Sequence, residues 1–343
     1  MLLTDYLITE KTALQDPRWF PHDYDISSRR IRLLYAERDY WASKRFLDER
    51  RITEVLPVRD ISADDPALLS RHEPQLNFIW NTAFCCSTLL ADLLEKPGCN
   101  LSLREPQIMV KLAAVRQNGA AAGPIPSAAV LHLLARRFDH DEQITIKPSV
   151  VVNSFMNEVA HCSNGKMLFL HSDLQTFLLA IARRKEAGRM FAQSLFATLA
   201  LEGLVPSGLS PETRLSGAKT AALAWHMQMA MFTQALSHYG DRARSLDCSD
   251  FLSCPRETLI ALDSFFTLRL GEVHIDDAVM GSLMSRHAKE LRTYDVHTRK
   301  KENDALRAQL GPEFDRAIAW SREVCATIPA VLPYPLCNTG TRQ

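Results

Sequence analysis

Short apolar runs recur along the middle of the chain and alternate with longer stretches in which apolar residues return every three or four positions. The apolar runs occupy residues 76–80, 100–103, 143–147, 166–170 and 243–246. Short runs without strict alternation are typical of strands that are buried on both faces of a sheet. We therefore predict five strands at these positions.

The stretches between these runs have helical spacing. In residues 88–96, Leu89, Leu90, Leu93 and Leu94 share one face, and Pro97 follows as a stop signal. Similar reasoning predicts helices at 108–116, 127–138, 173–185, 191–201, 213–237 and 255–268. Strands that alternate with helices predict an α/β fold in which a parallel sheet is covered on both faces. Ligands bind such sheets at the carboxyl ends of the strands.

The first 70 residues have a different composition, rich in Arg, Asp and aromatic residues. We predict one short helix here, at 43–51, with Ser43 as its N-cap. We find no candidate chemistry in this part of the chain. We therefore predict two parts: residues 1–70 as an N-terminal extension packed on the main body, and residues 71–343 as the main domain.

Composition narrows the functional classes. Lys plus Arg and Asp plus Glu number 40 each among 343 residues, so the formal net charge is zero. A dedicated nucleic-acid binder would carry a basic excess, so we expect no nucleic-acid partner. Neither a signal peptide nor a membrane-spanning apolar stretch is visible, so we expect a cytoplasmic protein with no membrane partner. The eight cysteines contain no CxxC pair, which favours reduced thiols and no metal site.

Residues with chemical potential gather at the predicted strand ends. Ser87 and Thr88 add hydroxyl donors to a turn that opens a helix, a place where backbone N–H groups attract anions. Lys147 is the best candidate cation and Glu105 the best candidate base. Each has a simpler interpretation: Lys147 as a strand-end lysine with its head in water, and Glu105 as a structural partner of Arg104 or a helix cap. Arg104 and His171 are the alternative cation and base, although a lone histidine beside a strand usually packs in the core.

These strand ends resemble the sulfotransferase family in order and spacing. The matching segments are Thr82–Leu90, Leu103–Pro106, Ile146–Ser149, Phe169–Leu174 and Ser245–Leu252, so the resemblance covers about residues 75–270. It implies a three-layer P-loop fold with a central parallel sheet flanked by helices. It also implies a reaction that transfers a sulfuryl group from 3′-phosphoadenosine 5′-phosphosulfate (PAPS) to a hydroxyl or amine of a small-molecule or saccharide acceptor. Lys147 and Glu105 would be the catalytic residues.

The resemblance also assigns cofactor-binding positions, several of which depart from the family pattern. The loop positions are Phe84, Cys85, Cys86, Ser87 and Thr88, and the position for the 3′-phosphate is Ser172. Phe84 stands where the family has Lys or Arg, Cys86 where it has Gly, and Ser172 where it has Arg. We therefore expect Arg183 and Arg184 to hold the 3′-phosphate. A second basic cluster, at Arg286, His287 and Lys289, loosely resembles the loop that closes over PAPS, although such a run is usually a solvated helix face.

Two functional hypotheses remain. The first is a PAPS-dependent sulfotransferase, supported by Lys147, Glu105 and the Ser87–Thr88 pair. The second is a non-catalytic nucleotide- or anion-binding protein on the same fold, favoured by Phe84 and Ser172. A kinase-like phosphotransferase is the weakest reading because GxxxxGK[ST] is absent. We expect the adjacent cysteines 85 and 86 to line the loop rather than act as nucleophiles, since no histidine is near them in sequence.

Overall fold

The computed structural model describes residues 10–49, 51–68, 73–117, 124–209, 215–281, 283–284 and 296–337. The chain forms two compact units. The first comprises Met1–Ile79, Leu94–Lys166 and Ser264–Leu270, and the second comprises Trp80–Leu93, Met167–Asp263 and Gly271–Gln343. The first unit thus contains both N-terminal residues and later parts of the chain, while the division at residue 70 stays a prediction.

The main sheet has five strands in the order β5-β6-β4-β7-β8. Their bounds are Asn100–Arg104 (β5), Gln143–Lys147 (β6), Asn77–Asn81 (β4), Met167–His171 (β7) and Ala243–Asp247 (β8). The registers of β5 with β6, β6 with β4, and β7 with β8 are parallel. Every residue of β4, β5 and β7 is buried, as strands covered on both faces must be. The predicted α/β fold, a central parallel sheet flanked by helices, is confirmed.

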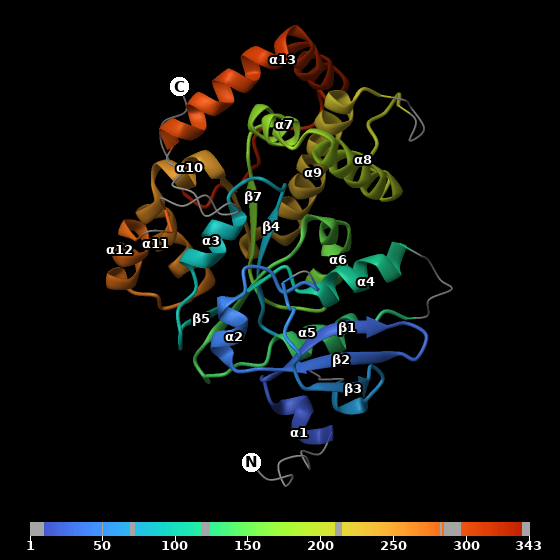
Figure 1. The fold of residues 1–343 in the computed structure, drawn as a ribbon, viewed down its shortest axis with the longest axis vertical. Helices are drawn as coiled ribbons and strands as arrows, with labels where there is room; N and C mark the ends of the chain where they lie inside the picture. The colour runs from blue at the N-terminus through green and yellow to red at the C-terminus, as the bar shows by residue number, and fades with distance from the viewer. Residues whose placement is uncertain are drawn as a thin grey trace. The chain divides into compact units, whose positions relative to one another are not determined.

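The first unit also contains a small antiparallel sheet that the sequence did not reveal. Its strands are β1 (Trp19–Asp25), β2 (Arg30–Tyr35) and β3 (Val58–Ser62), in that order (Figure 1). The β1–β2 turn is closed by Asp25, whose carboxylate accepts hydrogen bonds from the Ser27 amide (2.9 Å) and the Ser28 hydroxyl (2.6 Å). Hydrogen bonds between an Asp side chain and groups two and three residues further on fix a turn locally. Helices α4 (Gln107–Gln117) and α5 (Ser127–Leu134) contact β1.

The prediction of a helix at 43–51 was wrong. The helix in this region is α2 (Arg38–Ser43), so Ser43 ends it and does not cap its start. Trp41 explains the difference, because its ring is fully buried and stacks on Phe20 with centroids 4.6 Å apart. Its indole N–H donates to the carbonyl of Ala36 at 3.1 Å. The burial of Trp41 therefore accounts for the helix position better than the predicted cap at Ser43 does.

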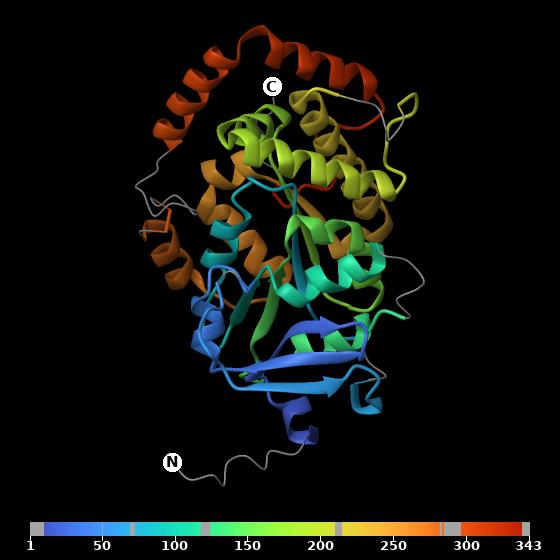
Figure 2. The ribbon, with the colours of Figure 1, turned by 45° about the vertical axis from the view of Figure 1, so that its right-hand side comes forward.

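The second unit is mostly helical. Its helices include α3 (Ser87–Leu93), α7 (Leu174–Arg183), α8 (Lys185–Leu201), α9 (Gly217–Tyr239), α10 (Cys248–Ser253), α12 (Glu272–Met280) and α13 (Val296–Val324), while α11 (Pro255–Phe266) crosses into the first unit. Helices α7, α8 and α13 all contact α9. Helix α13 bends at Gly311, where φ is 61° (Figure 2). Among the described residues, no helix is long and apolar enough to cross a membrane.

Candidate active site

The two predicted catalytic residues lie side by side in the first unit. Strands β5 and β6 pair with Arg104 opposite Lys147, and the Glu105 amide donates to the Lys147 carbonyl at 2.7 Å. The Lys147 Nζ forms a short ion pair with Glu105 Oε1. The Lys147 side chain is 5% exposed and the Glu105 side chain 19% exposed. Each charged group has therefore lost most of its contact with water and has the other as its partner. The two residues are therefore in direct contact, and their catalytic roles stay predictions.

The Glu105 backbone is in an unusual conformation. Its φ is 54°, in the left-handed region that non-glycine residues rarely adopt. Residue 105 follows directly after β5 and precedes Pro106. Residues held in such conformations cluster at functional sites and persist only where the surroundings fix them. Here the hydrogen bond to Lys147 and the ion pair supply that constraint.

A residue that the sequence analysis passed over, Phe46, lies beside this pair. The Lys147 Nζ is 5.8 Å from the centroid of the Phe46 ring, within the range of a cation–π interaction. The following residue, Leu47, donates its amide to Arg104 O (2.8 Å) and accepts from the Gln107 amide (2.9 Å). The N-terminal part of the chain therefore contributes an aromatic wall to the Lys147–Glu105 pair. No spacing rule could have identified Phe46, because it lies far from residue 147 in sequence.

Arg104, the alternative cation, is used for structure. It is 3% exposed, and its Nε and Nη2 donate to the carbonyl of Lys44 at 3.0 and 2.8 Å. Nη2 also makes a short hydrogen bond to the Ala42 carbonyl. The guanidinium thus attaches residues 42–44 to the end of β5. This is a structural role, whereas the sequence suggested Arg104 as an alternative cation of the site.

The loop between β4 and α3 belongs to the second unit and is fixed by several hydrogen bonds. The Thr82 amide donates to Leu170 O at 3.2 Å, and the Cys85 thiol donates to the same carbonyl at 3.4 Å. The Thr82 carbonyl accepts from Gln228 Nε2 at 3.4 Å. Cys85 is fully buried, so its side chain packs beneath the loop.

Three residues of this loop adopt left-handed backbone conformations without being glycine. The φ angles are 67° at Ala83, 55° at Phe84 and 62° at Cys86. Turns that contain such residues can direct neighbouring backbone N–H groups toward one side, where an anion can bind. At Cys86, where the resemblance predicted from the sequence would place Gly, the left-handed backbone carries a conformational cost. Ser87 and Thr88 follow as the first residues of α3, and both are buried.

Phe84 is packed among aromatic residues. Its ring centroid lies 6.1 Å from that of Phe177 on α7 and 5.3 Å from that of Phe191 on α8. The guanidinium carbon of Arg184 lies 4.0 Å from the Phe84 centroid. Two of the predicted cofactor-binding residues, Phe84 and Arg184, are therefore in direct contact.

The neighbouring Arg183 has a different environment. Its Nη2 donates to Asn303 Oδ1 at 2.7 Å and lies 3.7 Å from a carboxylate oxygen of Glu302, both on α13. The two arginines predicted to hold the 3′-phosphate thus turn to different neighbours. The second basic cluster, Arg286, His287 and Lys289, lies outside the described residues.

Ser172 and Thr82 are buried polar residues at adjacent strand ends of the second unit. Both are 0% exposed, and neither hydroxyl has a hydrogen-bond partner among the described residues. The Ser172 carbonyl accepts a hydrogen bond from the Trp225 indole at 2.9 Å. Buried hydroxyls usually find a partner, so these two are available for a bound ligand or water. His171, the alternative base, is 2% exposed, with Nδ1 4.0 Å from Asp247 Oδ2.

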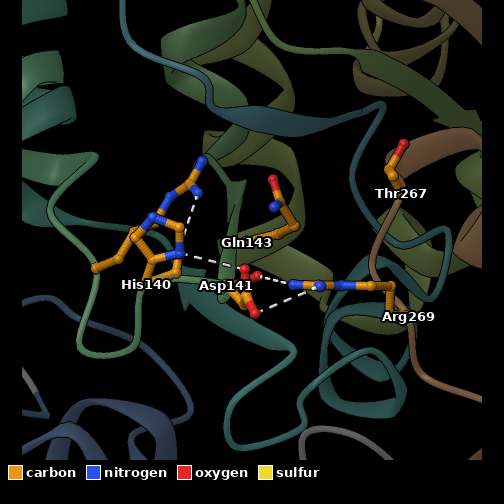
Figure 3. A pocket seen from close by; sticks show the side chains of 6 residues that line it. His140, Asp141, Gln143, Thr267 and Arg269 are labelled. Atoms are coloured by element: carbon orange, nitrogen blue, oxygen red, sulfur yellow. Dashed lines mark hydrogen bonds and ion pairs between the residues drawn. The ribbon is translucent and has the colours of Figure 1, made fainter.

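A surface hollow of about 600 Å³ lies elsewhere in the first unit (Figure 3). Its lining residues are Arg137, His140, Asp141, Gln143, Thr267 and Arg269. Gln143 begins β6, whereas Lys147 ends it, so the hollow lies at the opposite end of that strand. Asp141 is already paired with Arg269, as Figure 3 shows. The hollow includes none of the predicted site residues.

No model of a protein family matches the sequence, and no curated protein matches it. Eight solved chains are similar to it in structure. One of them is described as "Sulfotransferase Domain from the Curacin Biosynthetic Pathway"; the match covers 78% of this chain and 95% of that domain. The two sequences are 18% identical over the match, and the TM-score is 0.40.

Proposed function

We propose that this chain is a sulfotransferase that moves a sulfuryl group from PAPS to a hydroxyl or amine of a small-molecule or saccharide acceptor. The observation that carries the proposal is the ion pair of the buried Lys147 with the half-buried Glu105 at the ends of two adjacent parallel strands. Burying two charges costs several kcal/mol, and apolar residues of similar size would often stabilise a fold as well. Chemistry that needs a cation beside a carboxylate gives a reason for keeping the pair.

Each residue has a role in the proposed reaction. The acceptor oxygen or nitrogen attacks the sulfur, a new bond to sulfur forms, and the bond from sulfur to the 5′-phosphate oxygen breaks. The electron pair of that bond leaves with adenosine 3′,5′-bisphosphate. Glu105 takes the proton of the acceptor, and Lys147 stabilises the negative charge that develops on the transferring and leaving oxygens. Phe46 shields the lysine from water, which strengthens its electrostatic effect.

The loop at residues 82–88 is the proposed place for the phosphosulfate. Left-handed residues of this kind occur in loops whose backbone N–H groups bind anions, and the buried hydroxyls of Thr82 and Ser172 are further donors at adjacent strand ends.

The second candidate is a nucleotide-binding protein without catalysis. Phe84 favours it, because an aromatic ring packed on Phe177 and Phe191 replaces the cationic side chain of the resembling loop. Such a protein would bind adenosine 3′,5′-bisphosphate but transfer nothing. Both candidates therefore predict binding of adenosine 3′,5′-bisphosphate, and only the first predicts transfer of a sulfuryl group.

The test is transfer from radiolabelled PAPS to a panel of phenols, primary amines and sugars. Replacement of Lys147 by Met should reduce transfer by at least about a hundredfold, the usual effect of losing one charge-stabilising group. Lys111→Met is the matched control, because Lys111 forms partly exposed ion pairs with Asp23 and Glu49 in the same unit. Full activity of Lys147→Met would remove this residue from the mechanism. Ligand binding by the wild type without transfer to any acceptor would favour the second candidate.

A further inference from the structure

Arg184 is held at a tight corner between two helices. It follows the last residue of α7, and the next residue, Lys185, turns the chain into α8 with a left-handed φ of 50°. Gly188 allows the helices to meet, since a Cβ atom there would lie 2.0 Å from the carbonyl oxygen of Ile181. The Arg184 Nη1 donates to the Ala180 carbonyl at 2.8 Å. The position of this guanidinium is therefore fixed by packing.

The corner places Arg184 over the loop. Its guanidinium carbon is 4.0 Å from the Phe84 centroid, a close cation–π contact. Phe177 and Phe191 pack around the Phe84 ring and keep it in place. Phe84 itself belongs to the strained segment in which Ala83, Phe84 and Cys86 are left-handed. A positive charge thus accompanies the loop, although none is encoded in residues 82–88.

We propose that Arg184, carried on the Phe84 ring, supplies the cation of the phosphosulfate loop and binds the 5′-phosphate end of the nucleotide. This inference rests on the proposed function and changes the role predicted for Arg184, which was the 3′-phosphate. Phe84 then acts as a platform for the charge. Arginine suits the position because its guanidinium stays charged, stacks on aromatic faces and presents several donors to phosphate oxygens.

Two ligands distinguish a contact of Arg184 with the 5′-phosphate from a contact with the 3′-phosphate. Adenosine 3′,5′-bisphosphate and adenosine 5′-monophosphate share the 5′-phosphate, and only the first has a 3′-phosphate. Arg184→Gln should weaken binding of both ligands by a similar factor of about ten or more, as expected for a charged hydrogen bond. Arg189→Gln is the matched control, because Arg189 lies on α8, is exposed and pairs with Glu186. The control should change neither affinity by more than about twofold.

A rescue experiment tests the platform. Phe84→Lys restores a basic residue in the loop itself, so Arg184→Gln should cost much less affinity in that background than in the wild type. Phe84→Leu removes the ring and should weaken both ligands in the same direction as Arg184→Gln. Thermal denaturation of each variant checks that the unit remains folded.

The outcomes are distinct. A loss confined to the bisphosphate would return Arg184 to the 3′-phosphate and overturn the inference. Unchanged affinity of Arg184→Gln for both ligands would also overturn it, while the proposed function would stand on the binding that remains. If the wild type binds neither ligand, the proposed function fails first, and this inference fails with it.

Discussion

At the scale of single residues, Lys147 and Glu105 lie almost out of water, and each neutralises the other. Removal of one partner would leave a buried charge without compensation, which typically costs about 3–5 kcal/mol. Removal of both would leave two apolar side chains in contact. The stability and the chemistry of the pair can therefore be separated by experiment.

We predict that Lys147→Met lowers the free energy of unfolding by about 3 kcal/mol or more, and that adding Glu105→Met restores most of the loss. The double variant should still transfer no sulfuryl group. Urea denaturation monitored by circular dichroism measures the first effect, and the radiolabel assay measures the second. Recovery of transfer in the folded double variant would show that the pair is purely structural.

Backbone strain in the loop gives a second residue-scale prediction. Ala83 has a φ of 67°, which costs an L-residue about 1–2 kcal/mol and a glycine almost nothing. After allowing for the greater freedom of glycine in the unfolded chain, Ala83→Gly should stabilise the protein by up to about 1 kcal/mol.

The matched control for this prediction is Ala91→Gly, within helix α3. It should destabilise the protein by about 1 kcal/mol, because glycine is unfavourable in a helix. Both changes are read from urea midpoints. Equal destabilisation by the two replacements would mean that the loop is unstrained at Ala83.

Residue types at the strand ends could be predicted from the sequence, and their partners could not. Lys147 and Glu105 follow apolar runs, and parallel strands bring such ends together. The contact of Phe84 with Arg184 depends instead on the α7–α8 corner. The contact of Phe46 with Lys147 likewise joins distant parts of the chain, next to the hydrogen bonds of Leu47 with Arg104 and Gln107. These are tertiary contacts without a local sequence signal.

At the scale of elements, the packing of α9 buries a histidine. His226 is 2% exposed, and neither ring nitrogen has a hydrogen-bond partner among the described residues. Burial, assisted by the charge of Arg322, lowers the pKa of His226 to about 4. The folded protein therefore holds a neutral imidazole where the unfolded chain would take up a proton near pH 6.5.

This difference predicts a dependence of stability on pH. The contribution of His226 is complete above about pH 6.5 and is lost as the pH falls from there toward about 4. Between about pH 7.5 and about pH 5, the loss should be about 2 kcal/mol. Burial lowers the pKa values of His22 and His132 in the same direction and raises that of Glu95, which acts oppositely.

Comparison with the His226→Gln variant isolates the contribution of His226 to the pH dependence of stability. Urea denaturation of both proteins at the two pH values gives two differences in free energy of unfolding. The variant should lose about 2 kcal/mol less than the wild type. An equal loss in the two proteins would contradict the assignment to His226.

The elements that the sequence predicted well are those with a uniform environment. Strands β4 to β8 are apolar runs and were found within one or two residues. Strands β1 to β3 carry charged and aromatic residues on a partly exposed sheet, so no apolar run marks them. Helix α2 has no side-chain cap at Glu37, and its position depends on the burial of Trp41. Strands β1 to β3 therefore lack the apolar run, and helix α2 lacks the side-chain cap, on which a sequence-based prediction depends.

At the scale of the whole molecule, the N-terminal residues are part of the first unit. Arg136 donates to the carbonyl of Ala13 at 2.8 Å and to that of Trp19. Arg104 donates to the carbonyls of Ala42 and Lys44. Both guanidinium groups would lose buried acceptors without this part of the chain, at about 1–3 kcal/mol for each unsatisfied group.

We therefore predict that a chain of residues 71–343 alone does not unfold cooperatively. Calorimetry of this truncated chain should show a broad transition of low enthalpy, compared with a sharp one for the full chain. Tryptophan fluorescence of the shorter chain should indicate solvent-exposed side chains. A sharp transition at the melting temperature of the full chain would show that residues 71–343 fold independently.

Isothermal titration of the full protein with adenosine 3′,5′-bisphosphate, with ATP in parallel, would show whether this chain uses PAPS. We predict that the bisphosphate binds at about micromolar Kd and that ATP binds at least about tenfold more weakly. Absence of binding for both nucleotides, or equal affinity for the two, would contradict this prediction.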